Sequence, residues 1–122
     1  MVLADTSVWV SHFRASEPHL KTILDEEKTL CHPFVIGELA CGNLKPRQEI
    51  LSLLQVLPSA SIVSQSELLY FIERKRLAGT GIGFIDAHLL ASCQLAGVPL
   101  WTLDRRLRQT AEKLNLAYSP AS

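Results

Sequence analysis

Cysteine is scarce in this sequence, and its three copies form no ligand pattern. Cys31, Cys41 and Cys93 are odd in number and widely spaced, with no CxxC pair among them. Cys31 precedes His32, but no second pair of ligands exists to complete a zinc site. A disulfide framework is equally unsupported, so we expect three buried, reduced thiols in a cytosolic protein.

Long apolar runs are missing as well. No stretch approaches the roughly 20 consecutive apolar residues that cross a bilayer, and the first residues lack the features of a secretory signal. We therefore expect a cytoplasmic protein without a membrane partner. Because 48% of the residues are hydrophobic, the chain can bury a core of its own, and a single domain over residues 1–122 is predicted.

Neither charge is in excess. The 12 basic and 12 acidic residues cancel, which is unusual for a protein that binds nucleic acid. If four acidic residues bind a metal ion, 8 remain against the 12 basic ones. The basic residues gather at 45–47, 74–76 and 105–108, either as solvated helix positions or as contacts for RNA. The candidate RNA-binding residues are Lys45, Arg47, Arg74, Lys75 and Arg105.

Short apolar runs alternate with longer segments of helical periodicity. Strands are expected at residues 2–4, 29–31, 61–63 and 98–102. Helices are expected at 18–27, 33–41, 46–54, 66–79, 84–96 and 104–114. This alternation predicts an α/β fold, a single-domain α/β/α sandwich with a mostly parallel central sheet. Its ligand site should lie beyond the carboxyl ends of the strands.

Four acidic residues stand at positions where a structural role is hard to find. Asp5 and Asp104 each follow a predicted strand, so both face the same edge of the sheet, although either could instead cap the next helix. Glu38 and Asp86 lie within otherwise apolar helices, where a carboxylate is costly unless it is paired with a basic side chain or a cation. Four such residues converging on one edge favour a cation.

Convergent carboxylates repel one another, and a divalent ion removes that penalty. Oxygen ligands without histidine or cysteine select Mg²⁺ or Mn²⁺ rather than zinc. Such an ion activates a water and neutralises a phosphate oxygen, which is the chemistry that cleaves a phosphodiester.

Four segments resemble, in order, the four motifs of the PIN-domain family: residues 2–7 (VLADTS), 37–42 (GELACG), 83–91 (GFIDAHLLA) and 100–107 (LWTLDRRL). Length, motif order and spacing are most similar to the VapC toxins of toxin–antitoxin pairs. Leu107 stands where many relatives have phenylalanine, a conservative change in packing.

This resemblance implies a Mg²⁺- or Mn²⁺-dependent endoribonuclease with Asp5, Glu38, Asp86 and Asp104 as its catalytic and metal-binding residues. Thr6 and Thr102 match small hydroxyl positions that help to orient a ligand or water. The implied partners are tRNA or ribosomal RNA as substrate and a VapB-type antitoxin, in a homodimer or a hetero-oligomer. Apolar helices at 20–24 and 50–54 suggest an exposed groove for such a partner.

Other functions fit the sequence less well. A phosphotransferase of the haloacid-dehalogenase type needs an aspartate two residues after Asp5, where Ser7 stands. The GxG at Gly81–Gly83 lacks the rest of a phosphate-binding loop and is interpreted as a flexible connection. The remaining alternative is a catalytically silent PIN module that binds RNA or protein.

Overall fold

Three short parallel strands form the sheet at the centre of the molecule. In the computed structural model, which describes residues 1–120, β1 (Val2–Ala4) lies between β2 (Thr29–Leu30) and β3 (Leu100–Trp101). Val2 pairs with Thr29, and Ala4 pairs with Trp101. All three strands are buried, as expected for the apolar strands of a parallel sheet. The predicted α/β class with a parallel sheet is confirmed.

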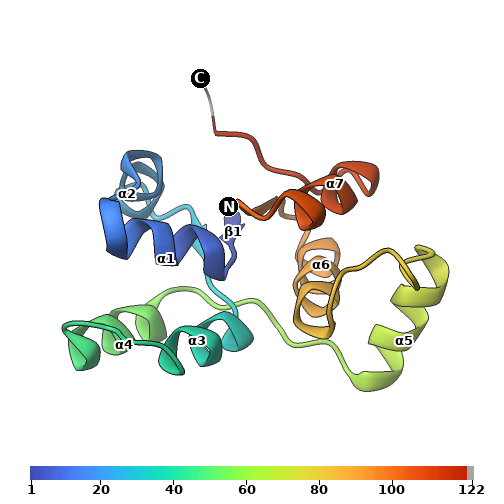
Figure 1. Ribbon diagram of the computed structural model, residues 1–122, viewed down its shortest axis with the longest axis horizontal. Coiled ribbons are helices and arrows are strands. Elements are labelled where there is room, and N and C mark those ends of the chain that lie inside the picture. The colour runs from blue at the N-terminus through green and yellow to red at the C-terminus, as the bar shows by residue number, and fades with distance from the viewer. Residues whose placement is uncertain (121–122) are drawn as a thin grey trace.

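Helices surround this sheet on several sides. Figure 1 shows α1 and α2 to the left of β1, α3 and α4 below them, and α6 and α7 to the right, with α5 packed on the outside of α6. Among residues 1–120, no helix is both long and apolar enough to cross a membrane. The helices are α1 (Thr6–Ala15), α2 (Pro18–Asp25), α3 (Pro33–Ala40), α4 (Arg47–Val56), α5 (Gln65–Arg74), α6 (Phe84–Ala96) and α7 (Arg105–Lys113).

Local signals in the sequence set several helix ends. Proline occupies the first turn of α2 and of α3, where its missing N–H costs nothing. Gly97 ends α6 in the left-handed conformation at φ 70°. The predicted cap of α5 at Ser66 is wrong: Ser64 is the N-cap, because it forms a reciprocal capping box with Glu67.

The structure differs from the predicted elements in three further places. Helix α1 was not predicted, since its valine and aromatic residues are weak helix formers. The predicted strand 61–63 does not form, and an isolated bridge joins Ser59 to Cys31 instead. Helix α5 ends at Arg74 rather than near Gly79, because Arg76 turns the chain at φ 56°.

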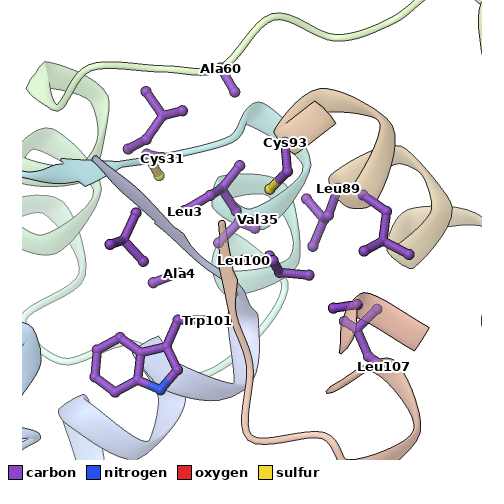
Figure 2. Packing of buried hydrophobic residues seen from close by; sticks show 14 of the residues in the cluster. Leu3, Ala4, Cys31, Val35, Ala60, Leu89, Cys93, Leu100, Trp101 and Leu107 are labelled. Carbon is purple, nitrogen blue, oxygen red and sulfur yellow. The ribbon is translucent and has the colours of Figure 1, made fainter. Parts of the chain in front are cut away.

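The hydrophobic core joins the sheet to the helices that follow it. Figure 2 shows Leu3 of β1, Val35 of α3, Leu89 of α6, Leu100 of β3 and Leu107 of α7 meeting around the strands. These contacts fix the ends of β1 and β3, and therefore the acidic residues that follow these strands.

Two expectations about burial are wrong: the exposed groove at residues 20–24 and the burial of Cys41. Leu20 and Ile23 of α2 belong to the core, so residues 20–24 do not form an exposed groove. Leu53 and Val56 of α4 are exposed. Cys31 and Cys93 are buried as expected, whereas Cys41 is exposed.

Candidate active site

Asp5 is buried at the carboxyl end of β1, where it is also the N-cap of α1. Its Oδ1 accepts hydrogen bonds from the Ser7 hydroxyl at 2.5 Å and from the Val8 N–H at 3.2 Å. Its Oδ2 accepts one from the Thr102 hydroxyl at 2.5 Å. Burial raises the pKa of Asp5, and these hydrogen bonds offset part of the rise. The carboxylate is therefore held in one orientation.

Asp104 occupies the equivalent place after β3. It is the N-cap of α7, with Oδ1 accepting from the Leu107 N–H at 2.8 Å, and its own N–H donates to the Thr102 hydroxyl at 3.0 Å. Both aspartates thus cap the helix that follows them, which was the alternative to metal binding in the sequence analysis. Within residues 1–120, however, Oδ2 of Asp104 accepts no side-chain or capping hydrogen bond, so capping leaves one oxygen available.

Glu38 lies on α3, which packs against α1. The hydroxyl of Thr6, the first residue of α1, donates to Glu38 Oε1 at 2.6 Å. The expectation that Glu38 lies on a buried flank is wrong, because its side chain is exposed where α1 and α3 meet. The alternative of an ion pair is also not found: among residues 1–120 the single ion pair joins Lys28 to Glu26.

Asp86 lies in the first turn of α6 and is half-buried. Burial is the main cause that raises its pKa, partly offset by a backbone hydrogen bond at Gly83. The negative charges of Asp104, Asp5 and Glu38 raise it further. The other three acidic residues predicted from the sequence are therefore close enough to Asp86 for their charges to disfavour its ionised form.

A hollow of about 330 Å³ opens beside two of these carboxylates. Asp86 and Asp104 line it together with Gly81, Arg105 and Arg106. In the part of the chain that the structure describes, no three His, Cys, Asp or Glu side chains are close enough to enclose an ion directly. The candidate metal ligands are carboxylate oxygens beside an open hollow. This arrangement suits a cation that retains part of its water shell, as Mg²⁺ does.

The two predicted threonines both lie at this site, and Ser7 joins them. Thr6 donates to Glu38, and Thr102 bridges Asp5 and Asp104. Ser7 donates to Asp5 and accepts from the N–H of Leu103 at 2.9 Å. Sequence reasoning missed Ser7 as a site residue, although its position two residues after Asp5 in a first helical turn favours such a bond.

The predicted RNA-binding residues are scattered. Arg105 alone among them lines the hollow with Asp86 and Asp104. Arg47 donates to the carbonyls of Ala40 and Gly42 near the end of α3. Arg74 and Lys75 line a separate hollow of about 700 Å³ between α5 and α6, and Lys45 is exposed before α4.

Comparisons with known proteins agree with this arrangement. The PIN domain family model matches residues 2–113. Ribonuclease VapC32, from two strains of Mycobacterium tuberculosis, is 42% identical over 118 residues, which cover 96% of this chain and 95% of the relative.

Two crystal structures share the fold at low sequence identity. PAE2754 from Pyrobaculum aerophilum has a TM-score of 0.64 at 18% identity, covering 93% of this chain and 90% of that one. FitAcB from Neisseria gonorrhoeae has a TM-score of 0.67 at 17% identity, covering 98% of both chains. The chain therefore belongs to the PIN-domain family, as a member of VapC type.

Proposed function

We propose that this protein is a divalent-metal-dependent endoribonuclease that acts as the toxin of a toxin–antitoxin pair. The observation that carries the proposal is the gathering of carboxylates at one place: Asp86 and Asp104 line one hollow, and Thr102 joins Asp104 to Asp5. Burial, together with the negative charges of the other three acidic residues, raises the pKa of Asp86. Among residues 1–120, none of the four has a basic side chain within ion-pair distance. A cation is the simplest compensation for charges arranged in this way.

Each carboxylate has a distinct part in the proposed site. Asp5, fixed by three donors, and Asp86, half-buried, would hold the ion. Asp104 offers its unbonded oxygen, and Glu38 is kept in position by Thr6. Mg²⁺ or Mn²⁺ bound there would supply an activated water and neutralise charge on the phosphate. Thr102 and Ser7 keep the Asp5 carboxylate oriented before any substrate arrives, and Thr6 does the same for Glu38.

RNA is the proposed substrate, cleaved at a phosphodiester bond of a tRNA or a ribosomal RNA. Support comes from the relative at 42% identity, which is named a ribonuclease, and from Arg105, which lines the hollow with Asp86 and Asp104. Action on such RNAs would place the protein in the cytoplasm, in keeping with its three free cysteines.

A VapB-type antitoxin is the proposed partner, in a hetero-oligomer or with a toxin homodimer. A hollow of about 350 Å³ between α1 and α3 combines apolar Val10, Phe13 and Leu44 with Thr6 and Glu38 of the acidic site. An antitoxin segment could bury apolar side chains there and direct an arginine toward the carboxylates, competing with the metal ion. Calorimetry of metal binding to the complex tests this, since inhibition that leaves metal affinity unchanged would rule out such competition.

Cleavage of a labelled pool of total RNA tests the activity. Purified protein is incubated with Mg²⁺, with Mn²⁺ or with EDTA, beside the variants Asp5→Asn and Asp86→Asn. Asp25→Asn, an exposed aspartate at the end of α2, is the matched control. We expect discrete fragments that need metal, persist in Asp25→Asn and vanish in the other two variants.

The same assay separates the enzyme from a silent binding module. Folded, partner-free wild-type protein that yields no metal-dependent fragments would contradict the nuclease proposal. RNA binding without cleavage would then favour the silent module.

A further inference from the structure

Arg106 lies against Gly81, although 25 positions separate them in the sequence. A Cβ atom added at Gly81 would stand 2.5 Å from Arg106 Nη1 and 2.9 Å from its Cδ. Gly81 also has φ +89°, in the left-handed region that favours glycine. The backbone of the loop between α5 and α6 therefore forms a surface on which the arginine side chain rests.

The stability of the fold gives little reason for a cation at this position. Arg106 lies in the first turn of α7, where the helix dipole disfavours positive charge. Among residues 1–120, its guanidinium has no carboxylate within 4.0 Å and no hydrogen-bond partner. Arg105 beside it is also without such a carboxylate. Both cations are thus available to a ligand.

The location of Arg106 indicates the kind of ligand. It lines the hollow that contains Asp86 and Asp104, and it also lines a second hollow of about 380 Å³ with Arg105 and Gln109. Arg105 and Arg106 both line the two hollows, the first of which also has carboxylates and the second of which has none; of the two arginines, only Arg106 rests on Gly81. A polyanion passing from one to the other would meet this guanidinium directly.

We propose that Arg106, supported by Gly81, binds an RNA phosphate adjacent to the one that is cleaved. This inference rests on the proposed ribonuclease function and adds a substrate-binding residue to it. The planar guanidinium presents two parallel donors to phosphate oxygens, which a lysine cannot reproduce. The basic hollow would hold that phosphate while the carboxylates face the scissile one.

Binding of a fluorescent single-stranded RNA by anisotropy, across a range of salt concentrations, tests the role of Arg106. The Asp5→Asn background prevents cleavage during the measurement. We expect Arg106→Gln to weaken binding about 10-fold, equivalent to about 1.4 kcal/mol, because the phosphate loses its charge-assisted hydrogen bonds to the guanidinium. The salt dependence should lose about one phosphate contact. Arg108→Gln is the control, because Arg108 lies on the same helix but lines neither hollow.

Two glycine variants test the support. Gly79 and Gly81 both have positive φ, but a Cβ at Gly79 meets nothing within 4 Å. Gly81→Ala and Gly79→Ala therefore carry similar backbone strain, and only the former displaces Arg106. We expect Gly81→Ala to weaken RNA binding several-fold more than Gly79→Ala, and to add little to Arg106→Gln in the double variant.

The inference is overturned if Arg106→Gln binds RNA as tightly as Arg108→Gln with the same salt dependence, or if the two glycine variants bind alike. The same holds if the Asp5→Asn protein binds no RNA. Metal-dependent cleavage by the wild type would leave the ribonuclease proposal intact in any of these cases. If the wild type cleaves no RNA but RNA binding depends on Arg106, the nuclease proposal is overturned and the phosphate site is retained.

Discussion

The hydroxyl of Thr102 donates a hydrogen bond to Oδ2 of Asp5 at 2.5 Å, across 97 positions of sequence. The same hydroxyl accepts the backbone N–H of Asp104 at 3.0 Å. One buried threonine therefore connects the acidic residues that follow β1 and β3. Because the two strands are adjacent and parallel, a side chain as short as threonine can span their ends.

Replacing Thr102 by valine removes this connection while preserving the shape of the side chain. The Asp5 carboxylate loses a donor and the Asp104 N–H loses its acceptor, so we expect a loss of about 2 kcal/mol in the free energy of unfolding. Metal affinity should fall at least about 10-fold, as for other residues that orient ligands. Urea denaturation and metal titration measure the two effects. Unchanged metal affinity in a folded Thr102→Val protein would contradict the orienting role.

Thr29 offers the opposite case. Its hydroxyl is buried in β2 and has no hydrogen-bond partner among residues 1–120. Thr29→Val removes an unsatisfied polar group and places a good strand former in the sheet. We expect a gain of about 1 kcal/mol in the free energy of unfolding, with cleavage unchanged. A urea denaturation curve shifted to lower concentration would show that the hydroxyl stabilises the fold after all.

Asp86→Asn should increase stability in the absence of metal. Burial and three neighbouring carboxylates raise the pKa of Asp86, so its charged form at neutral pH disfavours the folded state. A neutral amide of the same shape removes that penalty. In EDTA we expect the melting temperature to rise by about 4 °C, corresponding to roughly 1 kcal/mol. The exposed Asp25→Asn variant should change little. A lower melting temperature for Asp86→Asn would show that the negative charge is compensated within the protein.

Buried His32 predicts a loss of stability at mildly acidic pH. Its Nδ1 accepts the Phe34 N–H at 3.0 Å, so the proton of the neutral ring lies on Nε2 and points to the Ser92 hydroxyl. Burial, assisted by His88, lowers the pKa of His32 from 6.5 to about 4. Between these values the unfolded chain binds a proton that the folded protein does not.

The contribution of neutral His32 to the free energy of unfolding should therefore be complete above pH 6.5. It should decrease as the pH falls toward 4, by up to about 1.4 kcal/mol per pH unit. Denaturation series at pH 7.5 and 5 measure the difference. His32→Gln cannot titrate, and its difference should be smaller. An equal difference in both proteins would assign the effect to other groups.

The places of three acidic residues in the fold were predictable from the sequence, because local patterns define them. Asp5 and Asp104 directly follow apolar strands, and Asp86 interrupts an apolar helix. The exposure of Glu38 was not predictable in this way, since it depends on how α1 packs against α3, and α1 itself was missed. Helical apolar spacing indicates that a helix has a buried face, but it does not determine which neighbour covers each position.

Contacts made by loops between distant segments could not be predicted from the sequence. The segment containing Gly81 was interpreted as a flexible connection; the structure shows that it joins α5 to α6, with Gly79 and Gly81 at positive φ. Its contact with Arg106 depends on the placement of the loop after α5 relative to the start of α7. The bridge at Ser59, which forms in place of the strand predicted at 61–63, has a similar origin: the Cys31 N–H donates to the Pro58 carbonyl, and the Cys31 carbonyl accepts from the Ala60 N–H.

Binding of Mn²⁺, followed by electron paramagnetic resonance and calorimetry, tests most directly that the four carboxylates form a metal site. The wild type, Asp5→Asn, Asp86→Asn and the Asp25→Asn control are titrated without RNA or partner. We expect the wild type and Asp25→Asn to bind Mn²⁺ with the same affinity, and the other two variants to lose at least about 10-fold. Wild-type affinity in Asp5→Asn and Asp86→Asn, or no binding by the wild type, would contradict the metal site.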